Sequence, residues 1–291
     1  MYCLESSTDE EEADSQKMNR VHWGGPVARF LEPVLGAFFP NRCIICDTFI
    51  DSGCCICERC ERDIEIVYPP FCPRCGAPGR GRAPGRGRAP GRGRAPGRGR
   101  APGRGGDKPE GMCIQCKDLR FSFAKAESLG VYRGILRELI HQYKFEKRRG
   151  LARKFASLII QHKRGFVEQH TVIVPVPLTL QRLSERGFNQ ASLVAGRIAG
   201  PSGILLLDHC LKRRGSSKPQ SRFSMVSERQ ANLKDRFSVR ERYRDAVRGQ
   251  AVLVFDDVFT TGATSSACAE ALKRAGAQSI DLLTIARAVK E

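Results

Sequence analysis

Four C-x-x-C pairs constrain the folding of this chain more than any other feature of its sequence. Two cysteines separated by two residues bring both sulfurs to one ion, and four thiolates suit the tetrahedral coordination of Zn²⁺. If the pairs combine in sequence order, they form two closed, structural zinc sites. One site, or an interleaved pairing, is the alternative that the spacing leaves open. The eight cysteines are Cys43, Cys46, Cys57, Cys60, Cys72, Cys75, Cys113 and Cys116.

The cysteine total also indicates a cellular compartment. The chain has 13 cysteines, an odd number, and it begins with an acidic stretch rather than with the basic and apolar pattern of a secretory signal. Metal-binding thiols of this kind favour the reducing cytoplasm over a disulfide framework. No apolar run approaches the roughly 20 residues of a membrane span. We therefore expect a cytoplasmic protein without a membrane span, whose residues 1–26 form a disordered acidic tail.

A tandem repeat lies inside the cysteine-rich region. The unit Ala-Pro-Gly-Arg-Gly-Arg recurs across residues 77–105, and its nine arginines account for half of the formal net charge of +18. Glycine and proline at this density form neither helix nor sheet. We interpret the repeat as an insertion in a tolerant surface loop. The alternative is that the arginines bind nucleic acid. Such binding would be weak and salt-sensitive, because the repeat has no aromatic residues on which bases could stack.

The remaining organisation is that of a small module followed by an α/β domain. A helix at residues 27–39 and the cysteine pairs make up residues 27–120, and the second domain covers residues 121–291. In that domain buried strands alternate with helices, which predicts a mostly parallel, doubly wound sheet. Residues 210–236 are polar and aperiodic, and they predict either a mobile functional loop or a disordered segment. The expected strands are 126–132, 172–176, 203–207, 251–255 and 279–286, and the expected helices are 134–145, 150–163, 189–199 and 264–275.

The segment after the expected strand 251–255 carries the chemistry. Asp256 and Asp257 follow that strand at its carboxyl end, where open α/β sheets bind ligands. Two adjacent carboxylates can accept hydrogen bonds from the vicinal hydroxyls of a ribose. Residues 260–264 then turn into a helix, whose free amides and positive dipole end can hold a phosphate. The sequence therefore predicts a ribose 5-phosphate site. Its loop residues are Thr260, Thr261, Gly262, Ala263 and Thr264.

This segment, residues 252–264, resembles the phosphoribosyl-diphosphate signature of type I phosphoribosyltransferases. Upstream, Val-Ile-Val-Pro-Val-Pro at residues 172–177 and Arg-Leu-Ser-Glu-Arg-Gly-Phe-Asn-Gln at residues 182–190 are similar to the ComF family. These are phosphoribosyltransferase-like proteins, linked to natural competence, with an N-terminal double zinc ribbon. The resemblance runs from about residue 43 to the end of the chain and is interrupted only by the repeat.

The resemblance implies a type I phosphoribosyltransferase-like fold and further roles. Mg²⁺ would accompany phosphoribosyl diphosphate, and residues 212–236 would form a hood that closes over the site. It identifies neither a catalytic residue nor an acceptor. The candidates for holding diphosphate or its loop are Arg182, Arg186, Asn189, Lys218 and Arg229.

Three functions remain open at this point. The leading hypothesis is a protein that binds phosphoribosyl diphosphate or a nucleotide-like ligand and supports DNA uptake, with single-stranded DNA or a protein of the competence machinery as its partner. The second is a working phosphoribosyltransferase of nucleotide salvage or biosynthesis. The third is a non-catalytic adaptor for nucleic acid or a partner protein.

Overall fold

The computed structural model of the protein describes residues 41–50, 55–78, 112–113, 116, 120–213 and 236–289. The chain divides into two compact units, with the boundary between Cys57 and Glu58. Several expectations lie outside the described residues. These are the acidic tail, the helix at 27–39, the repeat beyond residue 78, and the candidates Lys218 and Arg229.

The first unit contains a cysteine turn closed by backbone hydrogen bonds. The Cys43 amide donates to the Thr48 carbonyl (2.8 Å), and an isolated antiparallel bridge joins Arg42 to Phe49. The Arg42 guanidinium lies 4.3 Å from the centroid of the Phe49 ring and pairs with Asp47. These contacts fold residues 42–49 into a tight knuckle.

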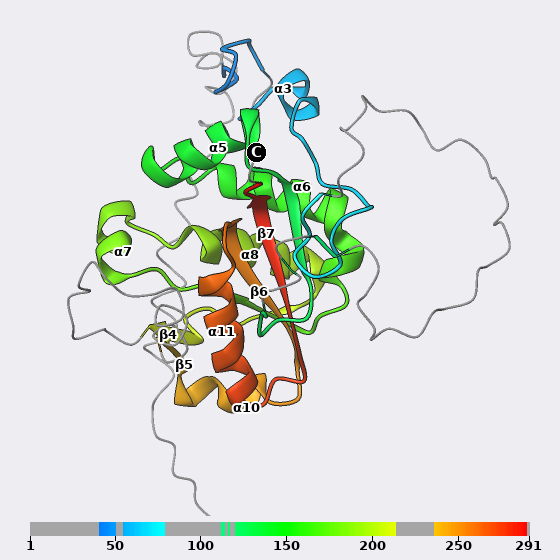
Figure 1. Ribbon diagram of the computed structural model, residues 1–291. Coiled ribbons are helices and arrows are strands. Elements are labelled where there is room, and N and C mark those ends of the chain that lie inside the picture. Colours follow the sequence, from blue (N-terminus) through cyan, green and yellow to red (C-terminus); the bar gives the residue numbers. More distant parts are fainter. Residues whose placement is uncertain are drawn as a thin grey trace, which may run out of the picture. The chain divides into compact units, whose positions relative to one another are not determined.

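The second unit is built on a five-stranded parallel sheet (Figure 1). Its strand order is β1-β7-β6-β2-β3. The central strands are apolar on both faces, because helices cover both sides of a parallel sheet. The strands are β1 (Ala126–Val131), β2 (Val172–Pro175), β3 (Leu205–Leu206), β6 (Ala251–Phe259) and β7 (Ser279–Arg287).

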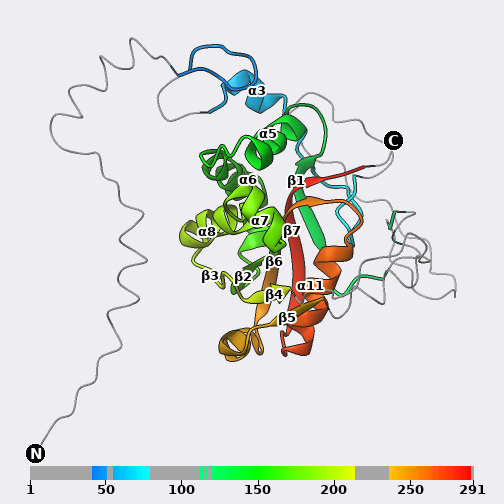
Figure 2. The same ribbon diagram turned by 90° about the vertical axis from the view of Figure 1, so that its left-hand side faces the viewer.

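Helices cover both faces of this sheet. Figure 2 shows α6 and α8 on one side of the strands and α11 on the other. Amphipathic spacing explains these positions, as in α5, where the buried residues Leu136, Leu139, Ile140 and Tyr143 recur at helical intervals. The helices are α3 (Glu58–Arg62), α5 (Gly134–Phe145), α6 (Leu151–Val167), α7 (Leu180–Arg186), α8 (Gln190–Ser202), η1 (Glu241–Tyr243), α10 (Arg244–Val247) and α11 (Ala263–Arg274).

The predicted doubly wound, mostly parallel sheet is confirmed, and three local features differ from expectation. Strand β6 continues to Phe259 instead of ending at Phe255, because β7 pairs with it as far as Arg287. Helix α7 was not predicted, because none of its residues is buried and it therefore lacks an apolar period. Strands β4 (Leu211–Arg213) and β5 (Phe237–Val239) pair antiparallel at the two ends of the segment that was expected to be a loop.

The sheet has a switch point between β2 and β6. The chain leaves β2 toward β3 at one edge, and it leaves β6 toward β7 in the opposite direction. The β2–β6 pairing ends at Pro175 and Phe255. In open α/β sheets ligands bind beyond the strand ends at such a point. The residues that follow Phe255 therefore occupy the binding position of this fold.

The described residues contain no helix that could span a membrane. None of their helices combines the length and the hydropathy that a bilayer crossing requires.

One buried hydroxyl ties the helix layer to the start of α8. The Tyr143 side chain is fully buried, and its hydroxyl donates to the Gln190 carbonyl (2.9 Å). We predict that Tyr143→Phe lowers the free energy of unfolding by about 1–2 kcal/mol, because the buried carbonyl loses its donor. Urea titration measures this change. Tyr68→Phe is the control, since Tyr68 is 58% exposed and removal of its hydroxyl should lower the free energy of unfolding by less. Equal stability of Tyr143→Phe and the parent would contradict the prediction.

Candidate functional site

Asp256 and Asp257 lie within strand β6 rather than in the loop after it. Both are half-buried, and Asp256 is in register with Thr284 of β7. On the other side of β6 the neighbouring strand has already ended at Pro175. The two carboxylates therefore stand where β6 is supported on one side only.

The environment of Asp256 disfavours its charge. Burial, followed by the negative charge of Asp257, raises the pKa of Asp256 to about 7. The Asp257 amide donates to Asp256 Oδ1 (2.8 Å) and the Ser265 hydroxyl donates to Oδ2 (3.5 Å), which partly offsets this rise. Near neutral pH this carboxyl can therefore both donate and accept a hydrogen bond.

Two cations face the carboxylate of Asp257. Lys144 Nζ lies 2.7 Å and Arg186 Nη1 lies 4.0 Å from Asp257 Oδ2. All three side chains are less than one-fifth exposed, so little solvent screens the pairs. Arg186 also donates to Gln190 Oε1 (3.1 Å), and its guanidinium is 5.7 Å from the centroid of the Phe145 ring.

The segment after β6 is an open turn on an aromatic support. Gly262 has a φ of 74°, in the left-handed region, and a Cβ there would lie 2.8 Å from both Phe121 Cε1 and Phe259 Cζ. Only glycine fits this position without a clash. The side chains of Thr260, Thr261 and Thr264 are exposed. We call residues 260–264, which lead into α11, the phosphate loop.

The phosphate loop has the features of an anion site. The Ala263 amide donates weakly to Thr261 Oγ1 (3.4 Å), and helix α11 begins at this residue. The positive end of a helix of this length, together with amides and hydroxyls that reach solvent, favours a bound phosphate.

Three arginines from separate segments form a further positive group, namely Arg182, Arg213 and Arg236. Loss of solvation, followed by the positive charges of Arg236 and Arg182, lowers the pKa of Arg213. Arg213 is therefore close enough to each of the other two arginines for their charges to repel its own. Arg213 belongs to β4 and Arg182 to α7, so the fold brings them together from positions 31 residues apart. An anion placed among them would relieve the repulsion.

Asn189 holds the backbone rather than facing solvent with a free amide group. Its Oδ1 accepts from the Ala191 amide (3.1 Å) and caps α8, while its Nδ2 donates to the Val176 carbonyl (3.1 Å). This side chain therefore fixes the start of α8 against the loop that follows β2.

The eight cysteines form two groups of four in the order expected from the sequence. In each group the four sulfurs lie within 4.8 Å of one another. The first cluster is Cys43, Cys46, Cys57 and Cys60, and the second cluster is Cys72, Cys75, Cys113 and Cys116.

The second cluster is suited to a structural Zn²⁺. Burial alone would raise the pKa of Cys72, but amide donors, first that of Cys113, lower it to about 7. Burial raises the pKa values of Cys75 and Cys116. A cation among these sulfurs would favour the thiolates, and four of them leave no open coordination position. Gly76 directly follows Cys75 and has a left-handed backbone conformation. A Cβ at this position would lie 2.5 Å from the Ala126 carbonyl oxygen.

The sequence did not identify Lys144 or Arg287 as site residues. Lys144 lies near the end of α5 and pairs with Asp257 of β6, more than 100 residues away in the chain. Arg287 is 3% exposed at the end of β7, and its Nη1 donates to the Thr260 carbonyl (3.0 Å). In the sequence, the only sign of Arg287 as a site residue was its charge at the end of an apolar strand.

The raised pKa of Asp256 predicts a measurable effect on stability. The folded protein binds more protons than the unfolded chain between about pH 4 and 7, so the free energy of unfolding should fall as pH rises through this window. Asp256→Asn removes this loss and keeps an acceptor for the Asp257 amide. We predict that the variant is more stable than the parent by about 2 kcal/mol at pH 8 and by much less at pH 5. Urea titration at both pH values measures this, with Asp245→Asn, at an exposed position, as the control. Equal stability at pH 8 would rule out the unfavourable burial of this carboxyl.

Known protein families include one that matches the cysteine-rich part of this chain. The double zinc ribbon domain family matches residues 34–90, which include the first cluster and the Cys72–Cys75 knuckle.

Three curated relatives align with most of the chain. Competence protein F of Haemophilus influenzae is 27% identical over 259 residues, which cover 86% of this chain and 99% of that protein. Competence protein ComFC of Bacillus subtilis is 25% identical, over 80% of this chain and 84% of its own length. DNA utilization protein YhgH of Salmonella typhimurium is 27% identical, over 80% and 90%.

Among solved structures, the glutamine phosphoribosylpyrophosphate amidotransferase of Bacillus subtilis is similar with a TM-score of 0.33 and 20% identity. The match covers 50% of this chain and 30% of that one. Together, the two cysteine clusters and the alignments confirm the resemblance stated from the sequence: this chain is similar over most of its length to Competence protein F, ComFC and YhgH, and it combines a double zinc ribbon with a parallel α/β sheet.

Proposed function

We propose that the protein binds phosphoribosyl diphosphate, or another ribose 5-phosphate, at Asp256, Asp257 and the phosphate loop. The observation that carries this proposal is the juxtaposition at the end of β6. Two half-buried carboxylates lie next to an open threonine turn that begins a helix. A phosphorylated sugar offers hydroxyls to the first feature and an anion to the second.

In this proposal the 5-phosphate binds at the phosphate loop. Thr260, Thr261 and Thr264 expose their hydroxyls there, and Gly262 allows close approach of the backbone. Charge-assisted hydrogen bonds from amides and hydroxyls are strong when the acceptor is a phosphate.

The ribose hydroxyls bind at the carboxyl pair. Lys144 and Arg186 form ion pairs with Asp257, and a carboxylate can accept hydrogen bonds from two hydroxyls. Asp256, with its pKa near 7, can share a proton with a hydroxyl. Asp256 can thus donate to or accept from one hydroxyl, while Asp257 accepts from its neighbour.

The arginine group of Arg182, Arg213 and Arg236 is the proposed site for diphosphate. The repulsion of Arg213 by the other two arginines makes this region favourable for an anion. The proposed Lys218 and Arg229 contacts lie outside the described residues. Mg²⁺ bound to the diphosphate would neutralise part of its charge, and carboxylate oxygens such as those of Asp256 and Asp257 are ligands that this ion accepts.

We further propose that the ligand-bound protein supports DNA uptake or DNA use from the cytoplasm. The names of the relatives, competence proteins and DNA utilization proteins, support this role. A reducing compartment suits clusters of four cysteines that hold metal as thiolates.

Calorimetry tests the ligand. We predict that phosphoribosyl diphosphate with Mg²⁺ binds the parent and raises its melting temperature, and that Asp257→Asn weakens binding at least about tenfold, because a hydrogen bond to a charged group is lost. Asp245→Asn should bind as the parent does. Unchanged affinity of Asp257→Asn would exclude this carboxylate from the site, and absence of binding to the parent would reject the proposal.

The same samples separate a transferase from a binding protein. Release of diphosphate when purines, pyrimidines or amines are added would show transfer to an acceptor. Binding without release would favour a ligand-sensing role.

A genetic test addresses the biological role. We predict that, in a naturally transformable host that lacks its own relative of this family, the parent gene restores transformation and the Asp257→Asn gene restores it poorly. Transformation frequency and protein level are measured together, with the Asp245→Asn gene as the control. Equal rescue by all three genes would uncouple the ligand site from DNA uptake.

A further inference from the structure

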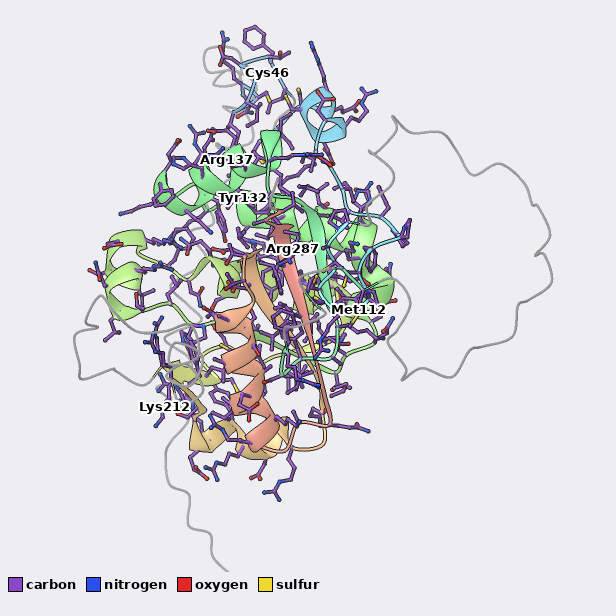
Figure 3. The ribbon with its side chains drawn as sticks, viewed as in Figure 1. Cys46, Met112, Tyr132, Arg137, Lys212 and Arg287 are labelled. Carbon is purple, nitrogen blue, oxygen red and sulfur yellow. The ribbon has the colours of Figure 1, made fainter. Side chains whose placement is uncertain are left out.

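Arg287 links the second cysteine cluster to the phosphate loop. This residue ends β7 (Figure 3) and is 3% exposed. Its Nη1 donates to the Thr260 carbonyl (3.0 Å), and its Nη2 donates to Cys75 Sγ (3.6 Å). One guanidinium therefore contacts a cluster sulfur and the first residue of the phosphate loop.

The position of this guanidinium is strongly determined. Its carbon lies 3.9 Å from the centroid of the Phe259 ring, and Arg287 is in register with Phe259 across β6 and β7. The Tyr132 amide donates to the Arg287 carbonyl (2.8 Å), and the Ala288 amide donates to the Phe259 carbonyl (2.9 Å). A planar group fixed on both sides can orient its two donors at once, which a flexible ammonium cannot do.

A second, apolar path joins the same two places. Phe121 stacks on Phe123, with centroids 4.7 Å apart, and meets Phe259 edge to face at 5.9 Å. Gly262 of the phosphate loop rests directly on Phe121 and Phe259. Phe123 and Phe259 belong to one buried core together with Cys72, Cys75 and Cys116. Displacement of the cluster would therefore disturb the surface on which the loop rests.

Charge explains why the metal-bound cluster would hold Arg287 in place. Four thiolates around one Zn²⁺ carry a net negative charge, and a buried guanidinium requires such a partner. A sulfur that accepts a hydrogen bond from a fixed donor is the usual arrangement around a structural metal. If the cluster were to open, Arg287 would lose this partner, and the Thr260 carbonyl would lose a well-placed donor.

We propose that Arg287 is a positioning residue that couples the metal-bound second cluster to the phosphate loop. The intact cluster orders residues 260–264, and a ligand at the loop in turn alters the surroundings of the metal, since coupling between two sites is reciprocal. The ordering of the loop stands on the contacts of Arg287 alone, whereas the effect on affinity rests on the proposed ligand.

The first experiment compares Arg287→Lys with Arg42→Lys. Arg42 is a matched control, because it also lies over a phenylalanine ring and donates to a backbone carbonyl, that of Asp47 (3.2 Å). Amide hydrogen exchange over residues 260–266 should be about tenfold faster in Arg287→Lys and unchanged in Arg42→Lys, while metal analysis finds the same zinc content in both. Unchanged exchange in Arg287→Lys would overturn the proposal.

The affinity for phosphoribosyl diphosphate is measured on the same proteins. We expect it to fall about tenfold in Arg287→Lys and to stay constant in Arg42→Lys. If the parent does not bind this ligand, the proposed function fails, and the exchange rates still decide whether Arg287 orders the loop. Faster exchange with unchanged affinity would remove the effect on binding.

A spectroscopic experiment needs no variant and covers the case in which Arg287→Lys does not fold. With ¹¹³Cd²⁺ in place of zinc, each cluster gives its own resonance, which the cysteine ligands and their hydrogen bonds determine. Phosphoribosyl diphosphate, or inorganic phosphate as a minimal probe, should shift the resonance of the second cluster and leave that of the first unchanged. A bound ligand that shifts neither resonance, or shifts both equally, would contradict the coupling.

Discussion

The pairing of β6 between two parallel neighbours of unequal length determines the rest of the site. Strand β2 stops at Pro175, whereas β7 accompanies β6 as far as Phe259. The strand segment that carries the half-buried Asp256 and Asp257 is therefore paired with a neighbouring strand on one side only. The same continued pairing places Arg287 beside Phe259 and beneath the phosphate loop.

Opposite charges are then distributed around this strand end. Lys144 and Arg186 form ion pairs with Asp257, while burial and the charge of Asp257 raise the pKa of Asp256. Arg182, Arg213 and Arg236 add positive charge from α7 and from both ends of the β4–β5 segment. The burial of Asp256 beside a second carboxylate and the repulsion at Arg213 are costly to the folded state, and such costs are typical of ligand sites.

The second cysteine cluster is part of the buried core around the sheet. In the second cluster, Cys72, Cys75 and Cys116 lie in the same buried core as the central strands, so this cluster and the sheet share one apolar interior. Its sulfur Cys75 Sγ accepts a hydrogen bond from the residue that also holds Thr260. The second cluster and the phosphate loop are thus parts of one structural arrangement.

The sequence by itself determined the elements and the chemistry that local spacing encodes. Cysteine spacing predicted both clusters, and the alternation of apolar strands with amphipathic helices predicted the parallel sheet, because these signals depend on near neighbours in the chain. The carboxyl pair and the threonine turn were predicted in the same way. Only the tertiary structure decided that Lys144 faces Asp257 and that Arg287 joins Cys75 to Thr260. It also decided that the Asn189 side chain forms hydrogen bonds with backbone groups. These contacts join residues far apart in the chain, and they depend on strand register and helix packing, which no local pattern encodes.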